Sequence, residues 1–76
     1  MTKLPRVTGR ELVSALREAG FEVIRVKGSH HFLKHSDGLC TVIPIHQSEI
    51  IGPGLMSKIL RDCEITRDEL LEFLRE

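Results

Sequence analysis

The residues of this 76-residue chain that are best suited to chemistry are its histidines. Three of the four, His30, His31 and His35, lie within residues 28–35, and His46 follows shortly after. Histidine changes its charge near neutral pH, so it is the usual side chain for moving a proton in a reaction. We therefore take residues 28–35 as the candidate site and expect the rest of the chain to hold it in place.

Metal binding is the first chemistry that four histidines and a cysteine suggest. His30 and His31 are neighbours in sequence, and on a strand they would point to opposite faces, so they could not readily bind one ion. Neither an HExxH nor a CxxC pattern is present, and a zinc site requires three or four converging ligands. We expect no metal and no other cofactor.

Nucleophilic catalysis is also poorly supported by the sequence. Ser29 precedes His30, but the GxSxG pattern of a nucleophile elbow is absent. Neither Cys40 nor Cys63 is next to a histidine in the sequence, although the fold could still bring a cysteine and a histidine into contact.

Acid–base cleavage of an RNA phosphodiester fits these residue types better. It requires one group to accept the 2′-hydroxyl proton, another to protonate the leaving oxygen, and cations to stabilise the phosphorane charge. His30 could fill either proton-transfer role, and His46 could approach the same end of the hairpin. Lys27 or Lys34 could supply positive charge. A lone histidine on a strand can equally be structural, so the residue types alone do not name a substrate.

The elements that must position these residues are predicted from capping signals and apolar spacing. Their expected ranges are 8–19 for a first helix, 21–26, 30–35 and 39–45 for strands, and 55–61 and 66–75 for two further helices. Capping boxes begin the first and last helices, at Thr8 and Thr66, and Gly20 ends the first. Turns are expected at 27–29 and 36–38, and a break between the later helices at 62–65.

The second strand divides its histidines between two faces, because alternate residues of a strand point in opposite directions. His30 would lie on one face, and His31 and His35 on the other. The sequence does not decide which face packs against the helices. It also leaves the partner of His30 on the third strand open between Pro44 and Ile45, because a change of one residue in the loop shifts the register.

Composition indicates one small folded domain, residues 1–76, of the α+β class. Hydrophobic residues make up 41% of the chain and charged residues 29%, which argues against disorder. No apolar run approaches the roughly 20 residues that cross a bilayer, and residues 1–6 lack the apolar core of a signal peptide. The two cysteines form no disulfide pattern. We expect a cytoplasmic protein with no membrane partner.

The net charge of zero hides an uneven distribution. Residues 1–61 hold nine Lys/Arg against five Asp/Glu, a net +4, and residues 62–76 hold two against six, a net −4. The basic excess accompanies the histidines and could serve a nucleic acid, but ordinary surface solvation also explains it.

Several segments together resemble the HicA family of bacterial and archaeal toxins, over roughly residues 8–74. They are a capped helix ending in Gly20-Phe21, the segment Lys27-Gly28-Ser29-His30-His31, the segment Val42-Ile43-Pro44-Ile45-His46, and Met56-Ser57-Lys58-Ile59-Leu60-Arg61. The resemblance implies a fold like a double-stranded-RNA-binding domain, a three-stranded antiparallel sheet with helices on one face.

The resemblance also implies an activity and a partner. HicA toxins of type II toxin–antitoxin pairs are metal-independent, ribosome-independent mRNA interferases, and a HicB antitoxin neutralises them in a hetero-oligomer by blocking the catalytic histidine. That histidine follows Gly-Ser and is His30 here. Lys58, at the start of the second helix, is implied to meet phosphates. The supporting or RNA-binding residues that we predict are Lys27, Gly28, Ser29, Lys34, His46 and Lys58.

Two alternatives stay open from the sequence. One is a non-catalytic RNA-binding module that uses the same basic surface, and the other is a domain that only binds a partner such as an antitoxin. The zero net charge and the polar loop 47–51 depart from what an RNA enzyme would be expected to have.

Overall fold

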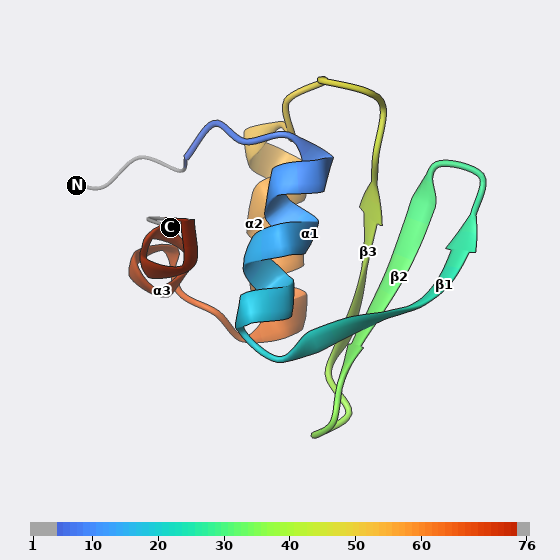
Figure 1. The fold of residues 1–76 in the computed structure, drawn as a ribbon. Coiled ribbons are helices and arrows are strands. Elements are labelled where there is room, and N and C mark those ends of the chain that lie inside the picture. The colour runs from blue at the N-terminus through green and yellow to red at the C-terminus, as the bar shows by residue number, and fades with distance from the viewer. Residues whose placement is uncertain (1–4, 75–76) are drawn as a thin grey trace.

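The computed structural model describes residues 5–74, which form three helices and three strands. They are α1 (Gly9–Glu18), β1 (Phe21–Lys27), β2 (His30–His35), β3 (Cys40–Pro44), α2 (Pro53–Cys63) and α3 (Arg67–Leu74). The strands form an antiparallel sheet in the order β1-β2-β3. The helices α1 and α2 pack against one face of it, and α3 packs on α1 away from the sheet (Figure 1). The predicted α+β fold, laid out like a double-stranded-RNA-binding domain, is confirmed.

The core fills the space between the sheet and the helices. Its fully buried side chains are Leu12, Leu16, Leu33, Ile43, Met56, Ile59 and Leu70. Removing such a side chain from water contributes about 1.5–3 kcal/mol, so this core is the main stabilising element of a small fold. Leu33 and Ile43 come from the sheet, and they identify its inner face as the one that bears alternate residues 31, 33 and 35 of β2.

The predicted helix starts are confirmed by reciprocal hydrogen bonds. The Thr8 amide donates to Glu11 Oε1 at 2.8 Å, and the Glu11 amide donates to Thr8 Oγ1 at 3.1 Å. Thr66 and Glu69 repeat the pattern before α3, at 2.8 and 3.1 Å. These bonds satisfy amides that the first turn of a helix leaves without partners. Gly20, with φ 104°, ends α1 in the left-handed region as expected.

The predicted range of the second helix, 55–61, was too short at both ends. The break predicted at 62–65 therefore begins two residues later, at residue 64. The helix α2 spans Pro53–Cys63. Its last turn includes Asp62, whose carboxylate accepts a hydrogen bond from Lys58 one turn earlier, at 2.9 Å. The helix ends where Glu64 takes a left-handed backbone, with φ 54°.

The strand ends also differ slightly from the prediction. Lys27 belongs to β1 and not to the turn, and β3 is one residue shorter at each end than the predicted 39–45. Ile45 lies just beyond the ladder, and its amide still donates to the Ser29 carbonyl in the β1–β2 turn, at 2.8 Å. The predicted end of the last helix at residue 75 lies outside the described residues. Within the described part of the chain, no helix is long and apolar enough to cross a membrane.

Candidate functional site

His30 begins β2 directly after a tight two-residue turn, Gly28-Ser29. Gly28 has a positive φ of 59° and Ser29 does not, a pattern typical of type II′ turns between antiparallel strands. The turn places Lys27 of β1 opposite His30, and Pro44 of β3 lies opposite His30 on the other side. The register that the sequence left open therefore has Pro44 as the partner of His30.

His30 lies on the open face of the sheet, the face that no helix covers in Figure 1. His31 pairs with the buried Ile43 on the inner face, so the preceding residue points the other way. The His30 side chain is exposed, and within residues 5–74 it has no hydrogen-bond or ion-pair partner. Its imidazole is therefore accessible to a bound molecule.

A bulge in β1 decides which cations share this face with His30. Val23 packs against the core, so uninterrupted alternation would turn Arg25 and Lys27 towards the helices. The register instead shifts between Val23 and Arg25, which adds one residue to β1. Arg25 therefore pairs with Phe32, and both face outward. Lys27 pairs with His30 in the same way.

Arg25 is a site residue that the sequence analysis missed. Its guanidinium carbon lies 5.8 Å from the centroid of the Phe32 ring, within the range of a cation–π contact. The signal that could have identified it is Val23-Ile24, two adjacent apolar residues that interrupt the alternation of the strand. Lys34 also lies on the open face, but its cross-strand partner is Glu22, which offsets part of its charge.

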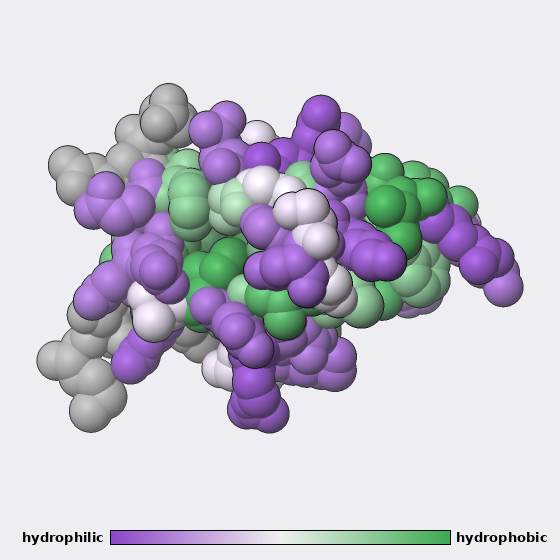
Figure 2. All heavy atoms as spheres, turned by 90° about the horizontal axis from the view of Figure 1, so that it is seen from below, coloured by the Kyte–Doolittle hydropathy of each residue, from purple (hydrophilic) through white to green (hydrophobic). Residues whose placement is uncertain are grey.

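Exposed apolar side chains lie next to Arg25 and Lys27 on β1. Ile24 is 59% exposed and Val26 is 55% exposed, both on β1. Figure 2 shows apolar surface gathered at the right of the molecule, the side on which Figure 1 places the hairpin of β1 and β2. Exposed apolar side chains therefore alternate with Arg25 and Lys27 along β1.

His46 lies at the same end of the sheet as His30. The hydrogen bond from Ile45 to Ser29 ties the start of the loop 45–52 to the β1–β2 turn. A second backbone bond, from the Ile51 amide to the Val7 carbonyl at 2.8 Å, holds the end of the loop. The side chain of His46 is exposed, and no hydrogen bond joins it to His30 in the described part of the chain. The structure thus brings the two residues to one region without linking their side chains.

Lys58 does not join the residues around His30. It lies in the middle of α2, not at its start, and its Nζ forms an ion pair with Asp62 at 2.9 Å. Asp62 also accepts from the hydroxyl of Thr41, a buried residue on the inner face of β3, at 3.1 Å. The hydrogen bond from Lys58 is the main cause that lowers the pKa of Asp62. Lys58 is therefore on the helix side of the sheet, and His30 is on the opposite side.

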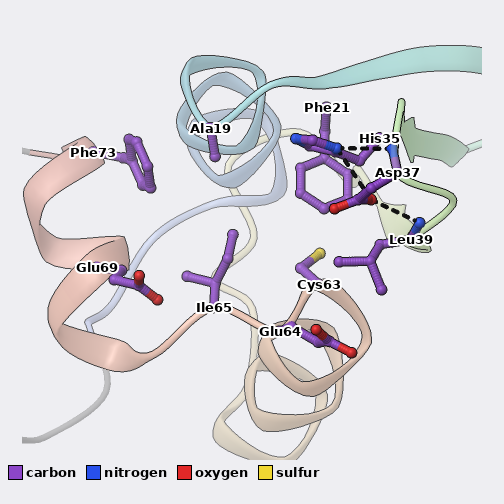
Figure 3. A pocket seen from close by; sticks show the side chains of 10 residues that line it. All are labelled: Ala19, Phe21, His35, Asp37, Leu39, Cys63, Glu64, Ile65, Glu69 and Phe73. Atoms are coloured by element: carbon purple, nitrogen blue, oxygen red, sulfur yellow. Dashed lines mark hydrogen bonds and ion pairs between the residues drawn. The ribbon is translucent and has the colours of Figure 1, made fainter.

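A second group of reactive residue types lines a pocket of about 260 Å³ at the other end of β2 (Figure 3). His35 Nδ1 lies 3.1 Å from Asp37 Oδ1, and Cys63 lines the same pocket. A Cys-His-Asp set could in principle form a nucleophile. Burial, however, raises the pKa of the Cys63 thiol to about 12, so at neutral pH it is protonated and unreactive.

Comparison with known protein families finds a match for most of the chain. Residues 9–65 match the model of a family described as the HicA toxin of bacterial toxin–antitoxin systems. The matched segment runs from α1 through the sheet to the end of α2, and it contains His30, Lys27 and His46. It stops before α3, and so covers less than the resemblance over 8–74. No curated protein matches the chain.

Proposed function

This chain belongs to the HicA family of bacterial toxins, and from that premise we propose that it is the mRNA-cleaving toxin of a type II toxin–antitoxin pair. The observation that carries the proposal is the position of His30. It is an exposed imidazole on an uncovered sheet face, opposite Lys27 and inside the matched segment. These are the requirements for a proton-transfer group that meets a polyanion.

The cleavage that these residues could support is an attack within the RNA itself. His30 would take the proton of a 2′-hydroxyl, whose oxygen then bonds to the adjacent phosphorus. The bond from phosphorus to the 5′-oxygen breaks, and that oxygen receives a proton. His30 can return the proton that it took, or His46 can donate one, since both lie at the same end of the sheet.

The lysines would act at different phosphates. Directly opposed residues of an antiparallel pair have Cβ atoms about 5 Å apart, so Lys27 can reach the same phosphate as His30 and stabilise its extra negative charge. Lys34 is four residues further along β2, about 13 Å away, and would contact a neighbouring phosphate. The turn residues Gly28 and Ser29 position His30 through the backbone.

The partner that we propose is a HicB-type antitoxin. A toxin of this family acts within a toxin–antitoxin pair, and the simplest way to neutralise it is to cover His30 on the open face. We expect a hetero-oligomer of the two proteins in the cytoplasm, where mRNA is present. The predicted phosphate contact of Lys58 would require RNA to reach the helix side of the sheet as well.

The test is induced expression of the wild type beside His30→Ala, following growth and the integrity of bulk mRNA. We expect the wild type to arrest growth with fragmented message. His30→Ala should do neither, because the loss of an acid–base group lowers the cleavage rate by about 10²–10⁴-fold. Circular dichroism should show the same fold for both proteins.

The matched control is His31→Ala, which changes the neighbouring histidine on the inner face of the same strand. It should stay toxic wherever it folds. If the His30→Ala variant is still toxic, the proposal is wrong. Purified protein that binds RNA without cutting it would instead identify a non-catalytic RNA-binding module.

A further inference from the structure

Phe32 and Arg25 lie beside His30 on the open face. Phe32 follows His30 by two residues on β2, so the two side chains share a face about 7 Å apart along the strand. The Phe32 ring is only half-buried, and the Arg25 guanidinium lies against it, 5.8 Å from the ring centroid. Nucleobases stack on aromatic rings and on arginine planes, and here a guanidinium over a half-exposed ring offers both.

Cations continue on both sides of this pair. Lys27 lies at the His30 end of the strand, and Lys34 lies two residues beyond Phe32 on the same face. Along β2 the open face therefore presents a cation with an imidazole, then an aromatic ring with a guanidinium, then another cation. Bases and phosphates alternate in the same way along a nucleic-acid strand, and single-strand binding proteins combine these two kinds of contact.

We propose that the open face binds unpaired RNA along β2, with one base stacked on Phe32 and Arg25 and an adjoining phosphate at His30. This inference rests on the proposed cleavage at His30 and specifies its substrate as single-stranded RNA. In a duplex the bases are paired and stacked on one another, so none is available to Phe32. The layout of the fold, although like that of a double-stranded-RNA-binding domain, does not require a duplex substrate.

Binding is tested in the His30→Ala background, which leaves the RNA intact and separates affinity from cleavage. The probe is a labelled RNA of about 12 nucleotides, used alone or annealed to its complement. We expect the unpaired RNA to bind more tightly than the duplex. Adding Phe32→Leu should raise its Kd about tenfold or more, because leucine keeps the apolar contact but cannot stack.

The control for this substitution is Phe73→Leu, which changes a half-buried phenylalanine of α3, the helix that packs on α1 away from the sheet. It should leave the Kd within about twofold of the parent. The same comparison pairs Arg25→Gln with Arg17→Gln, an exposed arginine of α1. Arg25→Gln should weaken binding several-fold. If the guanidinium also contacts a phosphate, the negative slope of log K against log salt should become about 0.7 less steep.

Cleavage by proteins that retain His30 separates this inference from the proposed function. Phe32→Leu should raise KM for unpaired RNA by a similar factor and change kcat much less. If the wild type cleaves RNA while both variants bind and cut it normally, or if it cuts duplex equally well, the inference is overturned and the role of His30 stands.

Two other results are also decisive. If the wild type cleaves no RNA, the proposed function fails, and the binding comparison still decides whether this face takes unpaired RNA. If the Phe32 and Arg25 variants lose affinity only for the antitoxin, the face is a protein-binding surface and the inference is wrong.

Discussion

His30 and His35 stand at the two ends of β2 with opposite surroundings. His30 is exposed on the open face, without a side-chain partner in the part of the chain that the structure describes. His35 packs edge-on against Phe21, with ring centroids 5.1 Å apart, and contacts Asp37. These contacts make His35 part of the packing at this end of the sheet. The same residue type thus has different environments at the two ends of β2, and of these two only the exposed one fits the proposed acid–base role.

Cys63 gives a pH prediction at the same scale. Burial raises the pKa of its thiol from the ordinary 9.0 to about 12, so the folded protein retains a proton that the unfolded chain loses near 9.0. Its contribution to stability is complete below pH 9 and is lost as the pH rises towards 12. Between about pH 8 and pH 10.5 we expect the free energy of unfolding to fall by about 1–2 kcal/mol from this group. Urea denaturation at the two pH values measures it.

The control for this prediction is a pair of cysteine variants. Cys63→Ala removes the buried thiol and should make the loss of stability between the two pH values smaller. Cys40→Ala changes an exposed thiol and should behave like the wild type. Equal losses in all three proteins would show that the Cys63 thiol ionises as easily when folded as when unfolded.

At the scale of elements, the first turn of α1 holds the end of β3 that lies opposite His30. A Cβ atom on Gly9 would collide with the Pro44 carbonyl oxygen and lie 3.1 Å from Ile45 Cγ1. The helix can approach the strand this closely only because residue 9 has no side chain. Pro44 pairs with His30 across the sheet, so the contact between α1 and Pro44 fixes the strand next to His30.

Gly9→Ala should therefore destabilise the protein by about 1–3 kcal/mol, because the backbone carbonyl has to move to make room. For a chain of this size, each kcal/mol lowers Tm by about 4–8 °C, which thermal unfolding can measure. Gly54→Ala is the matched control. Gly54 lies in the first turn of α2 with nothing near its Cβ position, so alanine there should stabilise by up to about 1 kcal/mol. Similar effects at both positions would contradict the close packing of α1 on β3.

At the scale of the whole molecule, α3 adds a layer outside the segment that matches the family. It packs on α1, away from the sheet (Figure 1), and its acidic residues Asp68, Glu69 and Glu72 are therefore remote from the open face. The open face carries Arg25 and Lys27 near His30. The zero net charge of the chain thus sums an acidic surface at α3 and a basic one on the open face. It does not describe the open face, which would contact RNA.

Leu70 tests whether this layer stabilises the fold. Its side chain is fully buried, so Leu70→Ala should cost about 2–4 kcal/mol, a large fraction of the stability of a small domain. Leu71→Ala, at a half-buried neighbour, should cost less. Urea denaturation measures both. Under conditions where Leu70→Ala is fully folded, it should cleave RNA like the wild type, because α3 is remote from His30; an altered kcat would contradict this separation.

Much of the fold could be predicted because its signals are local. Thr8 and Glu11 are three residues apart, and so are Thr66 and Glu69, so each capping box is visible in the sequence without knowledge of the rest. The α2 helix was predicted too short because the contacts of its last turn are not local. The Asp62 carboxylate bonds to Thr41, 21 residues earlier in the chain, and Cys63 is buried in the core.

The sequence by itself determined the elements, their order and the position of His30 after its turn, because residue type and short spacing decide these features. Only the tertiary structure decided which side chains share the open face with His30. The bulge in β1 brings Arg25 and Lys27 to that face, and the register of β3 places Pro44 opposite His30. Both depend on how strands distant in sequence pair and on which apolar residues the helices cover, and no short segment contains that information.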